Sequence, residues 1–433
     1  MYLSITMKKN NNLVLYFIGP SIINTRIWDT IKKSICTFYK MGTHISLYTP
    51  VLNLLSYTYR PYSTFNNSYT LRKLLHPTAK RIQSGASFLA RVHHKKRNYT
   101  REIFIKEIPL VPYNFILRPS EQGRVNYSCA YQNELSKYVY NVNSSGNIEI
   151  FISYFVSRLT ELDISPHFCK IFGCYSTTMR KFTYPLDDED CDNSIYNKVK
   201  RGGEVCVVKS NVPIYLLALE KFNYELSDAV EGIKSAAQFY SIIFQIFAAL
   251  VCINHNYKIY HNDIHIGNIF LQKTAKTHLY YSVGGTLYKI PTFGYIIKII
   301  DWGRATYSIN SIQGKNLIFN NNSLCEGQYR YSTLYKEIPN ELGRNKWMDI
   351  VIATHSMLYS YGILRQYPAL FKKLYSLLKT TNGVYISIKS FNWNIYEHIG
   401  NSTFDITPEV LFETLFEDFT VDTVLNNKVY RII

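Results

Sequence analysis

A polar cluster interrupts the aliphatic stretch YKIYHNDIHIGNIFL at residues 257–271. Its members are an acid, two imidazoles and an amide, namely His261, Asp263, His265 and Asn268. Burying such groups costs free energy unless each finds a hydrogen-bonding partner. Their clustering therefore indicates either a dedicated hydrogen-bond network or a chemical use.

Two further charged residues stand within or directly after apolar sequence. Asp301 follows the run YIIKII, and Lys106 lies inside the run FIKEI. Considered alone, an acid after a strand is usually a turn or helix cap, and a lysine in a strand usually extends its amine to solvent. Considered together with residues 257–271, their order along the chain predicts one shared site.

The segments around these residues alternate between strand and helix patterns. RIQSGASFLARV and REIFIKEIPLV, joined by the basic turn HHKKRNYT, predict a hairpin that carries Lys106. Apolar residues with helical spacing then predict an amphipathic helix; they are Ile148, Phe151, Ile152, Phe155, Val156 and Leu159. CKIFGCYS and IYLLALEKF predict two more strands, the second ending at Glu220. Residues 236–256 predict a long buried helix that leads into the polar cluster.

The motifs occur in a known order. The spacing H-x-D-x-x-x-x-N that begins at His261 is that of the protein kinase catalytic loop, and the triplet DWG at Asp301 resembles the metal-binding D-F-G motif. With Lys106 in an upstream strand, the chain resembles the eukaryotic-type protein kinase superfamily over roughly residues 75–380.

The resemblance implies an α+β, two-lobed kinase-like fold with ATP between a small β-rich lobe and a larger, mostly helical lobe. We expect residues 1–75 to be an N-terminal extension of unknown role. Residues 76–222 would form the N-lobe with insertions, and residues 223–433 the C-lobe with a C-terminal helical extension.

The same resemblance implies a role for each polar residue. Asp263 would accept the proton of the substrate hydroxyl, and Asn268 and Asp301 would hold Mg²⁺, or Mn²⁺ in its place. Lys106 would contact the α- and β-phosphates of ATP. The backbone of residues Glu220 to Phe222 would meet the adenine edge as the hinge.

A strand lysine also needs an acidic partner from the first large helix. Glu149, near the start of the predicted amphipathic helix, is the first choice, and Glu134 in NELSKYV is the alternative. The phosphate-covering loop would contain Gly85 and Ser87. It has one glycine in place of G-x-G-x-x-G, so side chains crowd a turn that glycine would leave open.

His265 is the clearest departure from ordinary serine/threonine kinases, which have lysine at that position. HNDIHIGN resembles the catalytic loops of aminoglycoside and choline phosphotransferases and of haspin-type protein kinases. An imidazole near its reference pKa of about 6.5 would be only partly charged beside the γ-phosphate. The chain also lacks A-P-E after Gly303, so activation by loop phosphorylation is not expected.

The long segment before Asp301 favours one branch of the superfamily. THLYYSVGGTLYKIPTFGYIIKIID predicts an inserted hairpin that turns at Gly284 and Gly285. A similar insertion ending in I-P-x-x-G occurs in haspin-like kinases and in kinases of large nucleocytoplasmic DNA viruses. GQYRYS at residues 327–332 and a buried helix opened by Asp349 also resemble the viral group.

The favoured function is therefore a viral ATP-dependent serine/threonine protein kinase that phosphorylates a protein hydroxyl. Two alternatives stay open. One is a small-molecule phosphotransferase of the aminoglycoside or choline kinase type, suggested by His265. The other is a pseudokinase scaffold, suggested by the poor glycine loop and the basic charge.

The amino-acid composition indicates the general class of protein, its partners and its compartment. The chain has 433 residues, 47% of them hydrophobic, which is typical of a globular protein. A net charge of +17 would attract acidic partners. The 38 tyrosines and the abundant asparagine indicate AT-rich codons as a simpler cause of this charge, so no specific nucleic-acid partner is expected.

The eight cysteines are scattered along the chain, which predicts no zinc site and a reducing, intracellular compartment. For a viral protein this compartment is the host cytoplasm or the virion. No transmembrane segment is predicted, and the oligomeric state is left open.

Overall fold

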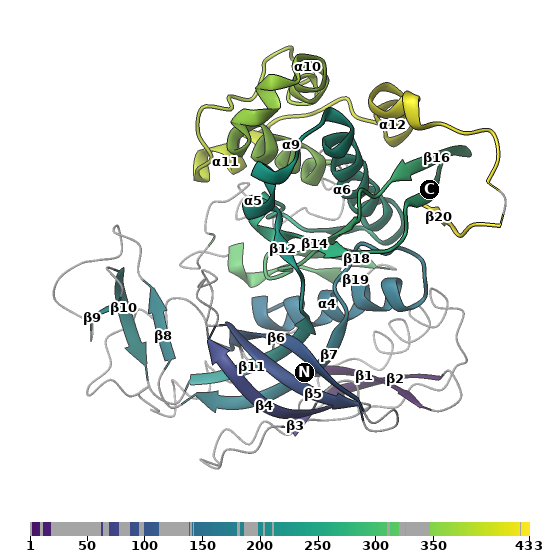
Figure 1. Cartoon of the computed structure of the whole chain (residues 1–433). Helices are drawn as coiled ribbons and strands as arrows, with labels where there is room; N and C mark the ends of the chain where they lie inside the picture. Colours follow the sequence, from purple (N-terminus) through teal and green to yellow (C-terminus); the bar gives the residue numbers. More distant parts are fainter. Residues whose placement is uncertain are drawn as a thin grey trace.

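The protein is an α+β chain, seen here in a computed structural model. The structure describes residues 2–8, 12–18, 62–63, 69–77, 87–94, 99–111, 138, 141, 143–179, 182–185, 198–201, 204–209, 212–309, 312–319, 325, 347–424 and 426–433. The predicted residues Gly85, Glu134 and 327–332 lie outside these ranges. Figure 1 shows a large sheet at one end of the molecule and most helices at the other.

The large sheet has six strands in the order β3-β7-β11-β6-β5-β4. The strands are β3 (Tyr62–Ser63), β4 (Tyr69–Pro77), β5 (Ser87–His94), β6 (Tyr99–Pro109), β7 (Ile171–Met179) and β11 (Val212–Glu220). β5 and β6 pair antiparallel, so the predicted hairpin is confirmed. β3 and β4 begin upstream of residue 75, so the sheet extends into the segment expected to be a separate extension.

Helix α4 (Ser145–Glu161) lies between this sheet and the other helices (Figure 1). It is the amphipathic helix expected from the sequence. Its apolar face is buried because Ile148, Ile152 and Leu159 recur at helical spacing, and each is fully buried. The same face also carries Glu149, which is thereby held in the interior.

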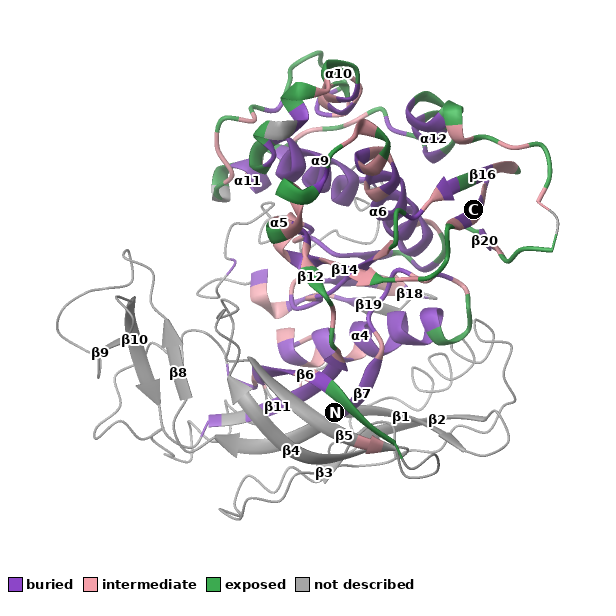
Figure 2. Ribbon diagram, viewed as in Figure 1, coloured by how far each residue is buried: buried purple, intermediate pink, exposed green. Residues whose placement is uncertain are grey.

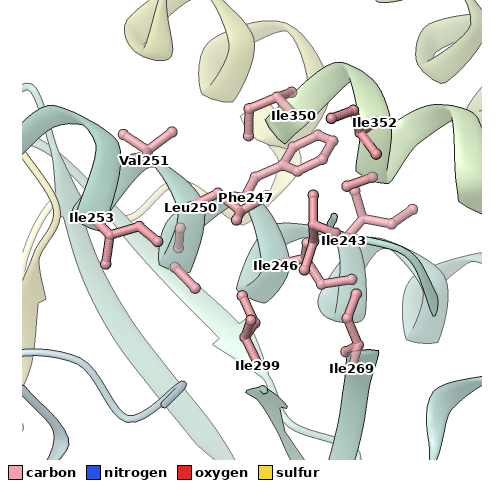
Figure 3. Packing of buried hydrophobic residues seen from close by; sticks show 14 of the residues in the cluster. Ile243, Ile246, Phe247, Leu250, Val251, Ile253, Ile269, Ile299, Ile350 and Ile352 are labelled. Atoms are coloured by element: carbon pink, nitrogen blue, oxygen red, sulfur yellow. The ribbon is translucent and has the colours of Figure 1, made fainter. Parts of the chain in front are cut away.

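Helix α6 (Ala236–Tyr257) forms the centre of the hydrophobic core, as predicted. The hydroxyl of Ser235 caps it by accepting a hydrogen bond from Gln238 N, and Lys258 ends it in a left-handed conformation, with φ of +52°. Figure 3 shows Phe247 and Leu250 of α6 packed among aliphatic side chains from other elements; these are Ile269, Ile299, Ile350 and Ile352. Burying each such side chain contributes roughly 1.5–3 kcal/mol.

Among the described residues, α6 is also the one helix long and apolar enough to cross a membrane. That property rests on length and composition only. Within the protein, 72% of its most apolar window is buried. The burial agrees with a core helix.

Two small sheets carry the polar loops. One has the order β12-β14-β17, with β12 (Tyr224–Glu225), β14 (Ile269–Lys273) and β17 (Tyr295–Ile299). The other has the order β13-β18-β19, with β13 (Ile259–Tyr260), β18 (Thr306–Ile309) and β19 (Ile312–Gly314). The loop at 261–268 joins β13 to β14, and the loop at 300–305 joins β17 to β18. Because β14 pairs with β17 and β13 with β18, the two loops lie side by side.

The predicted inserted hairpin is confirmed as β15 (His278–Val283) and β16 (Thr286–Pro291). Gly284 and Gly285 have φ of +55° and +92°. Positive φ at both central residues is the geometry of a two-residue hairpin turn that matches strand twist. A later strand, β20 (Val429–Arg431), pairs in parallel with β15.

The remaining described α-helices are α5 (Leu226–Ala229), α9 (Met348–Ser360), α10 (Pro368–Ser376), α11 (Trp393–Asn401) and α12 (Pro408–Phe416). Helices α9 and α12 pack against α6, and helices α10 and α11 pack against α9. Asp349 lies in the first turn of α9 and is fully buried, as predicted. Figure 2 shows buried residues concentrated on α6 and α9 and exposed residues on the outer faces of α10 and α12.

Two smaller sheets complete the described strands. They are formed by β1 (Tyr2–Lys8) with β2 (Asn12–Ile18), and by β8 (Phe182–Pro185), β10 (Glu204–Lys209) and β9 (Lys198–Arg201) in that order. β9 and β10 pair antiparallel, with Glu204 opposite Arg201.

Candidate active site

A buried lysine is shared by two carboxylates. Lys106 Nζ lies 2.6 Å from Glu149 Oε1 and 2.8 Å from Asp301 Oδ1. The lysine comes from β6 and the glutamate from α4. The aspartate lies in the loop at 300–305, two residues after the end of β17. The structure thus brings together three residues that are far apart in the sequence, and it places Glu149, the first choice from the sequence, against Lys106.

The pKa values of these three groups show how strongly the site favours the ionised form of each. Burial by itself lowers the pKa of Lys106, but Asp301 and Glu149 outweigh it, so the pKa lies above the ordinary value. Burial raises the pKa of Glu149 to about 7, and Lys106 offsets only part of this effect. Burial also disfavours the charged form of Asp301, yet Lys106 lowers the pKa of this group to about 2. Asp301 is therefore the carboxylate that stays ionised.

Asp301 has an unusual backbone conformation, with φ of +66°. Residues other than glycine rarely occupy this region, and such conformations persist where the surrounding structure enforces them. The next residue, Trp302, is buried against the rings of His261 and Phe168, at centroid distances of 4.6 and 6.1 Å. This packing fixes the turn that presents the Asp301 carboxylate to Lys106.

The Asp263 carboxylate is held by two donors. Arg304 Nη1 and the hydroxyl of Tyr396 both lie 2.9 Å from Asp263 Oδ1. Asn268 donates from Nδ2 to the backbone oxygen of Asp263 at 2.9 Å. The predicted catalytic-loop residues Asp263 and Asn268 are thus bonded to one another across the loop.

The buried carboxylate of Asp349 holds the backbone at the start of the loop at 261–268. Asp349 accepts hydrogen bonds from the N–H groups of His261 and Asn262, at 2.7 and 2.9 Å. His261 in turn contacts the backbone oxygen of Ile300 through Nε2 at 2.8 Å. Asn262, with φ of +62°, donates from Nδ2 to the backbone oxygen of Arg304. The loops at 261–268 and 300–305 are therefore fastened to each other.

His265 differs from the sequence expectation in its charge. Its Nδ1 accepts a hydrogen bond from Gly267 N at 3.1 Å, and its Nε2 lies 4.0 Å from Asp263 Oδ2. Burial lowers the pKa of His265, and the attraction of Asp263 and Asp301 offsets part of that shift. Burial therefore shifts the ring further toward its neutral form than the reference pKa would predict. A Cβ added at Gly267 would lie 3.0 Å from this ring, so the ring would have to shift to accept any larger residue there.

The predicted hinge connects β11 to β12. Glu220 Oε2 lies 3.7 Å from Lys298 Nζ of β17, and Lys298 also donates to the backbone oxygen of Phe168 at 3.1 Å. The carboxylate of Glu220 therefore binds β17, and its backbone N–H donates to the backbone oxygen of Lys170 at 2.9 Å. The ring of Phe222 packs against Phe270 at 5.4 Å.

The start of β5 lies beside the lysine. Ser87 is the register partner of Lys106 in the β5–β6 pair. The first residue of β5 therefore lies next to Lys106 in the sheet. This is the position that a loop over nucleotide phosphates requires, although Gly85 itself lies outside the described residues.

Comparison with known proteins agrees with this geometry. Over 130 residues the chain is 31% identical to a probable serine/threonine-protein kinase, 380R, of Invertebrate iridescent virus 6, covering 28% of this chain and 23% of that protein. It is 28% identical over 133 residues to the haspin homolog of Drosophila melanogaster, covering 30% and 23%, and 33% identical over 87 residues to haspin of Bos taurus, covering 20% and 11%. The chain resembles serine/threonine protein kinases.

The resemblance to the protein kinase superfamily inferred from the motifs is thus confirmed, with viral and haspin kinases among the relatives. The matched segments span less than a quarter of the length of these three relatives. No family model matches the chain.

The kinase-like site can supply oxygen ligands to a metal ion. Asn268 uses its amide nitrogen for the bond to Asp263, so its Oδ1 is the atom suited to coordination. Asp301 supplies an ionised carboxylate. Oxygen donors of this kind suit Mg²⁺, which usually takes one or two protein ligands and completes its shell with phosphates and water. Within the described ranges no cluster of three or more His, Cys, Asp or Glu residues that could hold a metal ion is found.

Two residues of the kinase-like site were missed from the sequence. Arg304 directly follows DWG, and its position three residues after Asp301 is a signal that could have indicated it. Tyr396 gives no such signal, because it is one of 38 tyrosines and lies 133 positions after Asp263.

Proposed function

We propose that this protein is an ATP-dependent serine/threonine protein kinase that transfers the γ-phosphoryl group of Mg-ATP to a protein hydroxyl. The observation that carries the proposal is the contact of Lys106 with both Glu149 and Asp301, in a site whose neighbouring loop holds Asp263. A lysine, its helix acid and a metal-binding aspartate must all be in place for phosphoryl transfer by kinases.

In this proposal each group acts on a different part of the reaction. Lys106 holds the α- and β-phosphates, while Asn268 and Asp301 hold the metal. Asp263 takes the proton of the acceptor hydroxyl as its oxygen attacks phosphorus. The metal, when bound, neutralises charge on the phosphate oxygens. The protein's contribution is positioning and electrostatic stabilisation.

The proposal also includes the two-lobed arrangement. The six-stranded sheet with α4 would be the N-lobe, within residues 76–222, and the α6-centred part, within 223–433, would be the C-lobe. Nucleotide would bind between them at the hinge from Glu220 to Phe222. We propose a viral source, which the similarity to an iridovirus kinase supports, and a place in the host cytoplasm or the virion.

A small-molecule phosphotransferase is the second candidate, favoured by His265 in place of a lysine. The relatives that match the chain are named as protein kinases, which supports the first candidate. The two differ in the acceptor that receives the phosphoryl group.

The test is incubation of the purified full chain with labelled ATP and Mg²⁺, together with either mixed protein substrates or a panel of aminoglycosides and choline. We expect label in protein only. Label in the small molecules would favour the second candidate, and no label in either would refute the transferase proposal.

Two variants give the assay its controls. We expect Asp263→Asn to abolish transfer and leave ATP binding nearly intact, because the carboxylate acts on the acceptor hydroxyl. We expect Asp301→Ala to lose Mg²⁺-dependent ATP binding together with turnover, because a metal ligand supports both. If Mg-ATP raises the melting temperature of Asp301→Ala as much as that of the wild type, the metal assignment is wrong.

A further inference from the structure

Tyr396 reaches the candidate catalytic carboxylate from a distant part of the chain. Its hydroxyl donates to Asp263 Oδ1 at 2.9 Å, and its side chain is buried. Helix α11, which carries it, belongs to the C-terminal region to which the sequence motifs assign no chemistry. Burial and the nearby Asp263 raise the pKa of Tyr396 well above its usual value, so the phenol keeps its proton.

The packing around Tyr396 fixes its hydroxyl. Ile395 and Ile399 anchor α11 in the hydrophobic core, and both are buried. The ring of Phe391 lies 5.7 Å from that of Tyr396 and 6.4 Å from that of His265. One aromatic side chain therefore contacts both the tyrosine and the catalytic loop.

Both donors to Asp263 meet the same oxygen. Arg304 and Tyr396 each contact Oδ1 at 2.9 Å, whereas the contact of His265 Nε2, at 4.0 Å, is to Oδ2. Two hydrogen bonds from different elements fix the rotation of the carboxylate about its Cβ–Cγ bond. With Oδ1 engaged in this way, Oδ2 is the oxygen suited to accept a proton.

We propose that Tyr396 is a positioning residue for phosphoryl transfer, holding Oδ1 of Asp263 together with Arg304 so that Oδ2 faces the acceptor hydroxyl. The inference rests on the proposed kinase function and deepens it. As the acceptor oxygen bonds to phosphorus, its proton passes to Oδ2 and the bond from phosphorus to the ADP oxygen breaks. Tyr396 itself exchanges no proton.

The test compares Tyr396→Phe with Tyr361→Phe. Each change removes one hydroxyl from a buried tyrosine, but the Tyr361 hydroxyl bonds to the backbone oxygen of Leu226 at 3.2 Å. We expect Tyr396→Phe to lower kcat about tenfold, as loss of roughly 1.4 kcal/mol of transition-state stabilisation would do, and to leave KM for ATP within about twofold. Tyr361→Phe should keep the wild-type kcat.

A second measurement does not need activity. Melting temperatures of wild type, Tyr396→Phe, Asp263→Ala and the double variant form a cycle that isolates the contact. Removing the hydroxyl should cost less in the Asp263→Ala background than in the wild type.

The outcomes separate the two proposals. If transfer by the wild type upholds the kinase function, either of two results would still overturn the positioning role. One is a wild-type kcat in Tyr396→Phe, and the other is a rise in KM for ATP as large as the fall in kcat. Additive melting losses would also overturn it, since the two groups would then not interact. A wild-type protein that phosphorylates no substrate would refute the kinase function and with it the role of Tyr396 in transfer.

Discussion

At the scale of single residues, His265 combines two tasks that the sequence had offered as alternatives. Its Nδ1 accepts from Gly267 N and so caps the short turn that ends at Asn268. Its Nε2 faces Oδ2 of Asp263. Because Nδ1 is an acceptor, the neutral ring carries its proton on Nε2, the atom on the side of Asp263.

The lowered pKa of His265 moves any pH dependence that it causes to the acid side. The folded protein keeps this ring neutral above the reference value of about 6.5, while the unfolded chain takes up a proton below it. The contribution of the neutral ring to stability is therefore present above about pH 6.5 and is lost as the pH falls. Between about pH 7 and 8 turnover should change less through His265 than it would through an imidazole at the reference pKa.

A pair of variants separates the two tasks of His265. Asparagine can accept from the N–H two residues on, as Nδ1 does, but cannot place a donor at the position of Nε2. We expect His265→Ala to slow transfer about tenfold or more, with His265→Asn intermediate. Turnover and melting temperature should be measured together, and equal turnover in the wild type and His265→Ala would show that the ring is dispensable.

At the scale of elements, the turn of the β15–β16 hairpin is specified by its two glycines. Gly285 has φ of +92° and open space where a Cβ would stand, so its requirement is conformational and not steric. Gly284, with φ of +55°, would place a Cβ 3.1 Å from Glu409 Cγ of α12. The turn is therefore both strained for other residues and packed against a helix.

We expect Gly285→Ala to lower the free energy of unfolding by about 1–2 kcal/mol, the cost of a left-handed conformation for a residue with a Cβ. Gly232→Ala is a matched control, since no atom lies within 4 Å of its Cβ position and its φ is not in the left-handed region. It should be neutral or slightly stabilising. Urea unfolding of both variants is the measurement, and equal stabilities would contradict the conformational reading.

Local sequence patterns predicted the elements but not all of their contacts. Helix α4 follows from the spacing of Ile148 to Leu159, and its placement after the lysine strand made Glu149 a sound choice. The burial of the His265 ring could not be predicted from local sequence, because it depends on groups from other loops. The contact of Tyr396 with Asp263 could not be predicted either, since it spans 133 positions and arises only when α11 packs on the loop at 261–268.

At the scale of the whole molecule, the end of the described chain returns to the inserted hairpin. β20 pairs with β15, and Asn256 of α6 donates to the backbone oxygen of Ile432 at 2.7 Å. Tyr430 and Ile432 are buried, and the ring of Tyr430 lies 5.7 Å from that of Tyr281. The last strand therefore covers one edge of the hairpin and part of the α6 core.

We expect Ile432→Ala to lower the free energy of unfolding by about 2–4 kcal/mol, because a fully buried aliphatic side chain leaves a cavity. Val429→Ala, at a half-buried position of β20 just before Ile432, should cost less. Urea unfolding checks both. A loss at Val429 that matches or exceeds the loss at Ile432 would show that the strand is not docked in this way.

The pairing of β20 with β15 also has a consequence during synthesis. Lys276, just before β15, and Tyr430 of β20 are in contact across 154 positions. At about 5–20 residues per second a ribosome needs roughly 10–30 seconds to add that length. During this time the β15 edge has no partner strand, and an open edge can pair with another chain. A chaperone that shields this hairpin would therefore have its largest effect on yield while the protein is still being made.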